Sequence, residues 1–69
     1  MDPHKLIQMA NRIAEFFAAM PGHAEAVEGV ATHLQKFWEP RMRAELRRAL
    51  EAGQAEDLHP LVREALAQP

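Results

Sequence analysis

Hydrophobic residues recur at spacings of three and four along most of the chain, which is the period of an amphipathic α-helix. The first series falls within a stripe of about 100° on one helical face, and we expect this face to be buried; its members are Leu6, Met9, Ile13, Phe16, Phe17 and Met20. Similar series follow over residues 27–38, 42–50 and 58–66. No segment alternates in the manner of a strand, so the pattern predicts a purely helical chain.

Proline and glycine mark the ends of these elements. Asp2-Pro3 offers an N-cap acceptor followed by proline at the first helical position, and Pro21-Gly22 ends the first series. Pro40 disfavours helical geometry in the residue before it and suits the start of a new helix, whereas Gly53 is a natural C-terminal cap. We therefore expect a small all-α fold of three to four helices in one domain spanning 1–69, with helices over about 3–20, 23–38, 41–52 and 60–67.

Composition limits how stable such a domain can be. The chain has 69 residues, 48% of them hydrophobic, and no cysteine that could form a disulfide or a thiolate metal site. A core of this size rarely supplies more than about 3–5 kcal/mol, and small domains often gain stability from a partner. The sequence has neither a run of about 18 apolar residues nor a signal-peptide pattern, so we expect a soluble cytoplasmic protein without membrane contact.

Few side chains offer catalytic or metal-binding chemistry. Serine, cysteine and tyrosine are absent, and Thr32 carries the only side-chain hydroxyl. The four histidines are not paired at the spacing of a helical metal site. His33 lies at the edge of an apolar stripe and is expected to be half-buried or to face a partner, and His59 is a poor candidate for the N-cap of the last helix. We expect no catalysis and no cofactor or metal in this chain.

The basic residues gather in one part of a chain whose net charge is −2. Residues 36–48 sum to +3 and the remainder to −5. On the third helix, however, Arg43 and Arg47 flank one side of the apolar stripe and Arg41 and Arg48 the other, so no single basic face forms for a phosphate backbone. Arginine around aromatic and methionine residues is typical of a protein interface. For Arg47 and Arg48, solvated side chains along the core edge are an equal alternative.

Two further features suggest a partner. The first helix has a second face of mostly small residues, Ile7, Ala10, Ala14 and Ala18. Gly29 costs its helix about 1 kcal/mol relative to alanine, which makes sense if a bulky group approaches, from a partner or from the fourth helix. Trp38 is expected to anchor either the core at the Pro40 corner or an interface. The predicted partner-binding residues are Gly29, His33, Phe37, Trp38, Pro40, Arg41, Met42 and Arg43.

The block from Phe37 to Arg43, Phe-Trp-Glu-Pro-Arg-Met-Arg, is uncommon. Together with residues 9–13, Phe16-Phe17, 29–31 and 60–66, it resembles the delta subunit of bacterial soluble NAD-dependent formate dehydrogenase. The resemblance runs from about residue 6 to residue 66, nearly the whole chain.

This resemblance implies a small accessory subunit without a cofactor, associated with assembly and stability of the enzyme. The implied partners are the other formate dehydrogenase subunits, with the large alpha subunit as the expected docking partner. In that family the alpha subunit carries a molybdenum or tungsten bis-pterin centre and iron–sulfur clusters. The beta subunit carries FMN and the NAD site, and the gamma subunit carries another iron–sulfur cluster.

Two other classes stay open from the residues alone. One is a free-standing helical adaptor or homodimer built on the same module. The other is a small helical protein that binds nucleic acid, which the placement of the arginines disfavours.

Overall fold

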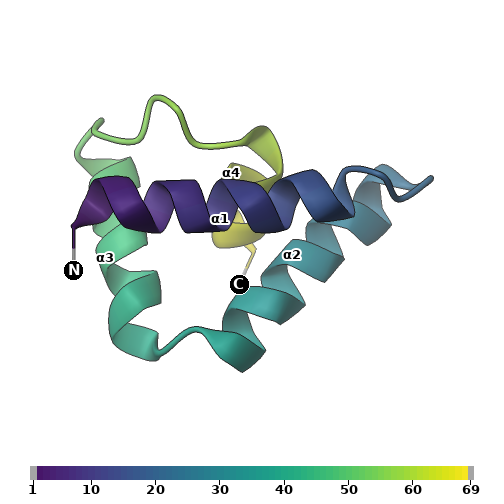
Figure 1. The fold of residues 1–69 in the computed structure, drawn as a ribbon, viewed down its shortest axis with the longest axis horizontal. Helices are drawn as coiled ribbons and strands as arrows, with labels where there is room; N and C mark the ends of the chain where they lie inside the picture. Colours follow the sequence, from purple (N-terminus) through teal and green to yellow (C-terminus); the bar gives the residue numbers. More distant parts are fainter. Residues whose placement is uncertain (1, 69) are drawn as a thin grey trace.

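The computed structural model describes residues 2–68, which form four helices and no strand. In Figure 1, α1 (Pro3–Phe17) runs across the molecule, α2 (His23–Phe37) and α3 (Pro40–Glu51) lie below it on either side, and α4 (Pro60–Ala67) lies behind it. The last helix packs mainly against α2 and also against α1. The predicted all-α fold is confirmed.

Local sequence signals explain where the helices begin and end. The Asp2 carboxylate accepts a hydrogen bond from the His4 amide at 3.0 Å, and proline occupies the first position of α1, α3 and α4. Gly53 follows α3 with a φ of +73°, a conformation that glycine adopts without strain. The amides of Gly53 and Gln54 reach back to the Leu50 and Ala49 carbonyls at 3.2 and 2.9 Å. These two bonds form a Schellman motif that ends the helix.

The core draws on all four helices and on the connection before α4. Its fully buried large side chains are Leu6, Val30, Leu46 and Val62, one from each helix. Ala55 and Leu58, in the segment that leads into α4, are also buried. The expected apolar residues of the last helix are all in the core.

The buried face of α1 differs from the expected one by roughly a quarter turn. Its buried residues are Leu6, Ile7, Ala10 and Ala14, whereas Met9, Phe16 and Met20 are 37%, 75% and 41% exposed. Three of these buried residues belong to the small-residue face that had suggested a partner, so that interpretation is wrong for them. Short side chains let the neighbouring helices approach α1 closely, and this contact takes precedence over burying its largest side chains.

The first helix also ends at Phe17, three residues before the expected end at Met20. Residues 18–20 form a turn in which the amides of Ala19 and Met20 bond to the Phe16 and Phe17 carbonyls. Pro21 explains this end, because a residue that precedes proline is disfavoured in helical geometry.

Asn11 ties the segment before α4 to α1. Its amide nitrogen donates to the Asp57 carbonyl, and its amide oxygen accepts from the His59 amide, both at 2.8 Å. His59 in turn caps α4, since its Nδ1 accepts from the Leu61 amide at 3.1 Å. The expectation that His59 would be a poor cap is therefore wrong: imidazole Nδ1 lies close enough to its own backbone to act as an asparagine oxygen does.

Asn11→Ala should lower the free energy of unfolding by about 1–3 kcal/mol, because it removes both bonds and leaves two backbone groups without a protein partner. Urea unfolding followed by circular dichroism measures the loss. Gln8→Ala, at an exposed position on the same helix, is the matched control and should leave the free energy of unfolding nearly unchanged. An Asn11→Ala protein as stable as the unaltered chain would contradict this role.

Candidate functional site

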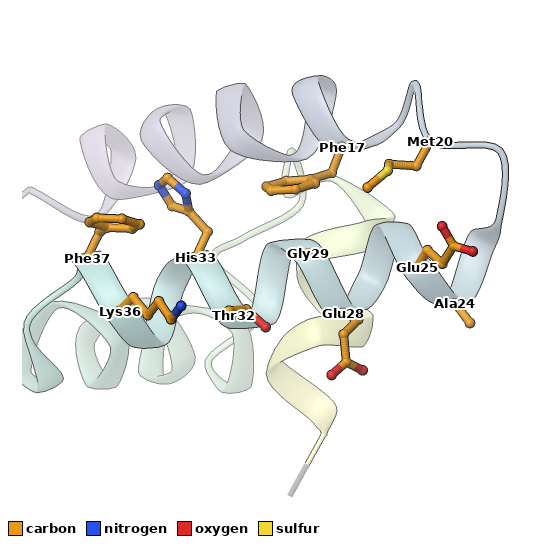
Figure 2. Close-up of a pocket in the computed structure, with 10 residues that line it drawn as sticks. All are labelled: Phe17, Met20, Ala24, Glu25, Glu28, Gly29, Thr32, His33, Lys36 and Phe37. Carbon is orange, nitrogen blue, oxygen red and sulfur yellow. The ribbon is translucent and has the colours of Figure 1, made fainter.

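A surface groove of about 630 Å³ runs along the outer side of α2 and ends beneath the last turn of α1. Figure 2 shows its ten lining residues, eight from the α2 region and two, Phe17 and Met20, from the end of α1 and the turn that follows. The groove lies outside the core, because its floor is the solvent-facing side of α2.

Aromatic rings form one wall of the groove. Phe16 packs edge-on against Phe17 with centroids 5.2 Å apart, Phe17 lies 6.4 Å from the His33 ring, and His33 lies 4.8 Å from the Phe37 ring. We call Phe16, Phe17, His33 and Phe37 the aromatic row. Phe16 and Phe37 are 75% and 72% exposed, so both ends of the row face solvent.

Gly29 lets the aromatic row lie directly on α2. A Cβ atom at this position would overlap the ring of Phe17, which therefore occupies the space that any other residue would fill. Of the expected explanations for this glycine, the approach of a bulky side chain is right, but that side chain comes from α1 of the same chain. Neither a partner nor α4 is needed to explain it.

The charged residues of the groove are separated along α2. Glu25 and Glu28 lie at the end near Met20, and Lys36 lies at the other end beside Phe37 (Figure 2). Acid in the first turn and base in the last turn also suit the dipole of α2 itself.

The structure divides the eight predicted partner-binding residues among three places. Gly29, His33 and Phe37 line the groove. Pro40 and Arg41 are exposed at the corner between α2 and α3, with Met42 half-buried beside them. Trp38 and Arg43 belong to the scaffold beneath that corner: the Trp38 side chain is only 6% exposed and packs in the core.

Arg43 holds the end of α2. Its Nη1 donates to the Trp38 carbonyl at 2.7 Å and to the Leu34 carbonyl at 3.1 Å, and lies 3.3 Å from the Gln35 carbonyl. The Leu34 carbonyl also accepts from the Trp38 amide at 3.1 Å, so the guanidinium adds a second donor there and supplies a donor to the Trp38 carbonyl. Its positive charge also complements the dipole at the end of the helix.

The sequence pattern predicts that Phe16 and Phe17 are both buried. Phe17 is half-buried and packs against the core, whereas Phe16 is 75% exposed, so the pattern does not reveal the row that the two rings form with His33 and Phe37. Their spacing along α1 does not reveal their exposure, because that depends on which face of α1 the other helices cover. The sequence pattern likewise does not mark Glu25, Glu28 and Lys36 as site residues. They are recognised as lining the groove only because the structure places them on the same side of α2.

The groove carries no cluster of metal ligands. Among residues 2–68, no three His, Asp or Glu side chains lie close enough together to hold a metal ion. His23 pairs with Glu64 at 2.8 Å and so links the start of α2 to α4. None of the helices in the described part of the chain is long and apolar enough to cross a membrane.

Comparison with known protein families matches residues 5–66 to the NADH-dependent formate dehydrogenase delta subunit, FdsD. The chain belongs to the FdsD family. This confirms the resemblance seen in the sequence. The FdsD match takes in both the groove and the corner around Pro40, and it leaves out only residues 1–4 and 67–69. No curated protein and no solved structure matches this FdsD-family chain.

Proposed function

We propose that this chain is a non-catalytic subunit of a cytoplasmic NAD-dependent formate dehydrogenase, and that it docks on the large alpha subunit to support assembly and stability of the complex. The proposal rests on one observation: the corner between α2 and α3 exposes an aromatic ring and an arginine to solvent. It is supported by the membership of the chain in a family of enzyme subunits. The molybdenum or tungsten bis-pterin centre, the iron–sulfur clusters and FMN then belong to the partner subunits.

The corner surface consists of Phe37, Pro40 and Arg41, all of which are exposed. It is held in place from below, because Trp38 fixes the chain to the core and Arg43 closes the end of α2. A surface that is rigid before binding loses less conformational entropy on docking. Aromatic and arginine side chains are also the residues that most often dominate the binding energy of protein interfaces.

A subunit without chemistry of its own acts by mass action. When it binds the folded or cofactor-loaded form of its partner more tightly than open forms, it shifts the population toward the loaded form. Its removal then changes how much enzyme is correctly assembled, and leaves each loaded active site as it was.

Omitting the chain during co-expression should therefore lower the yield, metal content or thermal stability of the holoenzyme, with turnover per loaded metal centre nearly unchanged. Metal analysis and activity of the purified complex measure the two quantities separately. Unchanged yield and stability, or a sharp fall in turnover per loaded centre, would contradict the proposal.

Arg41→Glu tests the corner itself. Reversing an interfacial charge places like charges together or removes a pairing, and we expect the amount of this chain that co-purifies with the alpha subunit to fall by about tenfold. Arg12→Glu, an exposed reversal on α1, is the matched control and should co-purify as the unaltered chain does. Equal co-purification of both variants would remove the corner from the interface.

A further inference from the structure

A second cleft, of about 680 Å³, lies between α2, α3 and the end of α4. Helices α2 and α3 diverge from the corner that joins them, and the cleft lies in the angle between them (Figure 1). It shares only Glu28 and Thr32 with the groove. Its lining is mainly polar, because Thr32, Gln35 and Gln68 contribute hydrogen-bonding side chains beside two arginines.

Arg43 and Arg47 bring two positive charges into this cleft from one side of α3. They are four residues apart, so their side chains are neighbours on the helix surface. Backbone carbonyls hold both of them: Arg43 Nη1 donates to the end of α2, and Arg47 Nη2 donates to the Leu66 carbonyl at 3.2 Å. Because both guanidiniums are held in place by the fold, a ligand loses less entropy in ordering them.

Each guanidinium keeps donors that the fold does not use. An arginine has five N–H donors, and within residues 2–68 no acceptor bonds to Nε or Nη2 of Arg43 or to Nε or Nη1 of Arg47. Neither arginine forms an ion pair with a carboxylate of the described chain. Glu28, the one acid among the described residues that line the cleft, is exposed on α2. The cleft therefore has an excess of positive charge and of donors.

A carboxylate is a ligand that fits these groups. The guanidinium presents a planar fork of donors that matches the two oxygens of a carboxylate, and such charge-assisted pairs are stronger than neutral hydrogen bonds. Aspartate and glutamate are the side chains by which a partner protein supplies this group. The chemistry of the cleft thus favours an acidic side chain as its occupant.

We propose that the cleft binds an acidic side chain of the large alpha subunit, between Arg43 and Arg47. This inference rests on the function proposed above and names a second contact with the same partner. The cleft begins directly behind the corner surface, because Gln35 is two residues before Phe37 and Arg43 donates to the Trp38 carbonyl. A subunit seated on the corner surface is therefore close enough to place a side chain in the cleft.

Arg47→Met tests this contact in the complex. Methionine keeps an apolar stem and removes the charge and the donors, so the dissociation constant for the enzyme complex purified without this chain should rise about tenfold. Arg47→Lys keeps the charge but lacks the fork, and should recover only part of the loss. Biolayer interferometry measures the binding of each variant, and circular dichroism checks that each is folded.

Arg48→Met is the matched control for both variants. Arg48 is exposed on the same helix and lies outside the cleft, so its replacement should bind as the unaltered chain does. Equal losses in Arg47→Met and Arg48→Met would show that only the general charge of α3 matters, which would overturn the assignment of the cleft.

Sodium acetate tests the cleft in the absence of the partner. Acetate presents the same carboxylate as an acidic side chain, and sodium chloride at equal ionic strength is the reference. In ¹H–¹⁵N NMR spectra of the isolated chain, the Nε–H signals of Arg43 and Arg47 should shift with acetate. The shift of Arg43 should largely disappear in Arg47→Met, because one guanidinium alone holds acetate less well.

These results separate the cleft from the corner surface. If Arg41→Glu lowers docking and Arg47→Met does not, the cleft contact is wrong and the proposed function stands. If the unaltered chain fails to bind the complex, both are wrong. Acetate-induced shifts with unchanged docking would assign the cleft to a free anion instead of a subunit side chain, and an absence of these shifts would refute carboxylate binding.

Discussion

Trp38→Ala should lower the free energy of unfolding by about 3–5 kcal/mol. This loss is as large as the total stability that a core of this size usually supplies. The ring is 6% exposed and lies within the core cluster directly before the corner, so truncation leaves a cavity where α2 meets α3. We expect the isolated variant to lose most of its helical circular dichroism at 25 °C. Of the two roles expected for this residue, the structure places its side chain in the core.

Phe37→Ala is the matched control, because it removes an aromatic ring one residue earlier that is 72% exposed. It should keep its helicity, and its free energy of unfolding should stay within about 0.5 kcal/mol of that of the unaltered chain, since exposed substitutions seldom change stability by more. A Trp38→Ala protein as stable as Phe37→Ala would show that the ring contributes little to the core.

Arg43→Met should cost about 1.5–3 kcal/mol, the range for hydrogen bonds that involve a charged group. Methionine keeps an apolar stem of similar length but cannot donate. The Trp38 carbonyl therefore loses the bond from Arg43 and the Leu34 carbonyl keeps only its bond from the Trp38 amide, while the packing is largely retained. Thermal unfolding of the isolated chain measures the loss.

Arg41→Met provides the comparison for this prediction. Arg41 is two residues earlier on the same helix and is exposed, so its replacement should leave stability nearly unchanged. If both variants unfold at the same temperature, the bonds of Arg43 to the end of α2 do not stabilise the fold.

Much of the fold could be predicted because short-range signals determine it. The apolar series and the prolines place four helices, and α4 buries every apolar residue that its pattern assigns to the core. These signals act within one turn of helix, so they do not depend on the rest of the chain.

The face of α1 could not be predicted for a different reason. Its large residues form as regular a stripe as its small ones, and hydrophobicity favours the large ones. What decides is how closely the other three helices approach α1, and the buried Ala10 and Ala14 permit an approach that Met9 and Phe16 would prevent. The α1 half of the aromatic row follows from the same choice, since the core leaves Phe16 exposed and Phe17 half-buried at its edge.

The contact between Phe17 and Gly29 imposes a size constraint that two positions share. Because any Cβ at position 29 would overlap the ring, enlarging one residue requires shrinking the other or moving α1 away from α2. Related sequences should therefore vary at the two positions in opposite senses, a large residue at one with glycine or another small residue at the other. A chain that exchanged the two sizes would keep its interhelical spacing but lose the middle of its aromatic wall, and with it the shape of the groove.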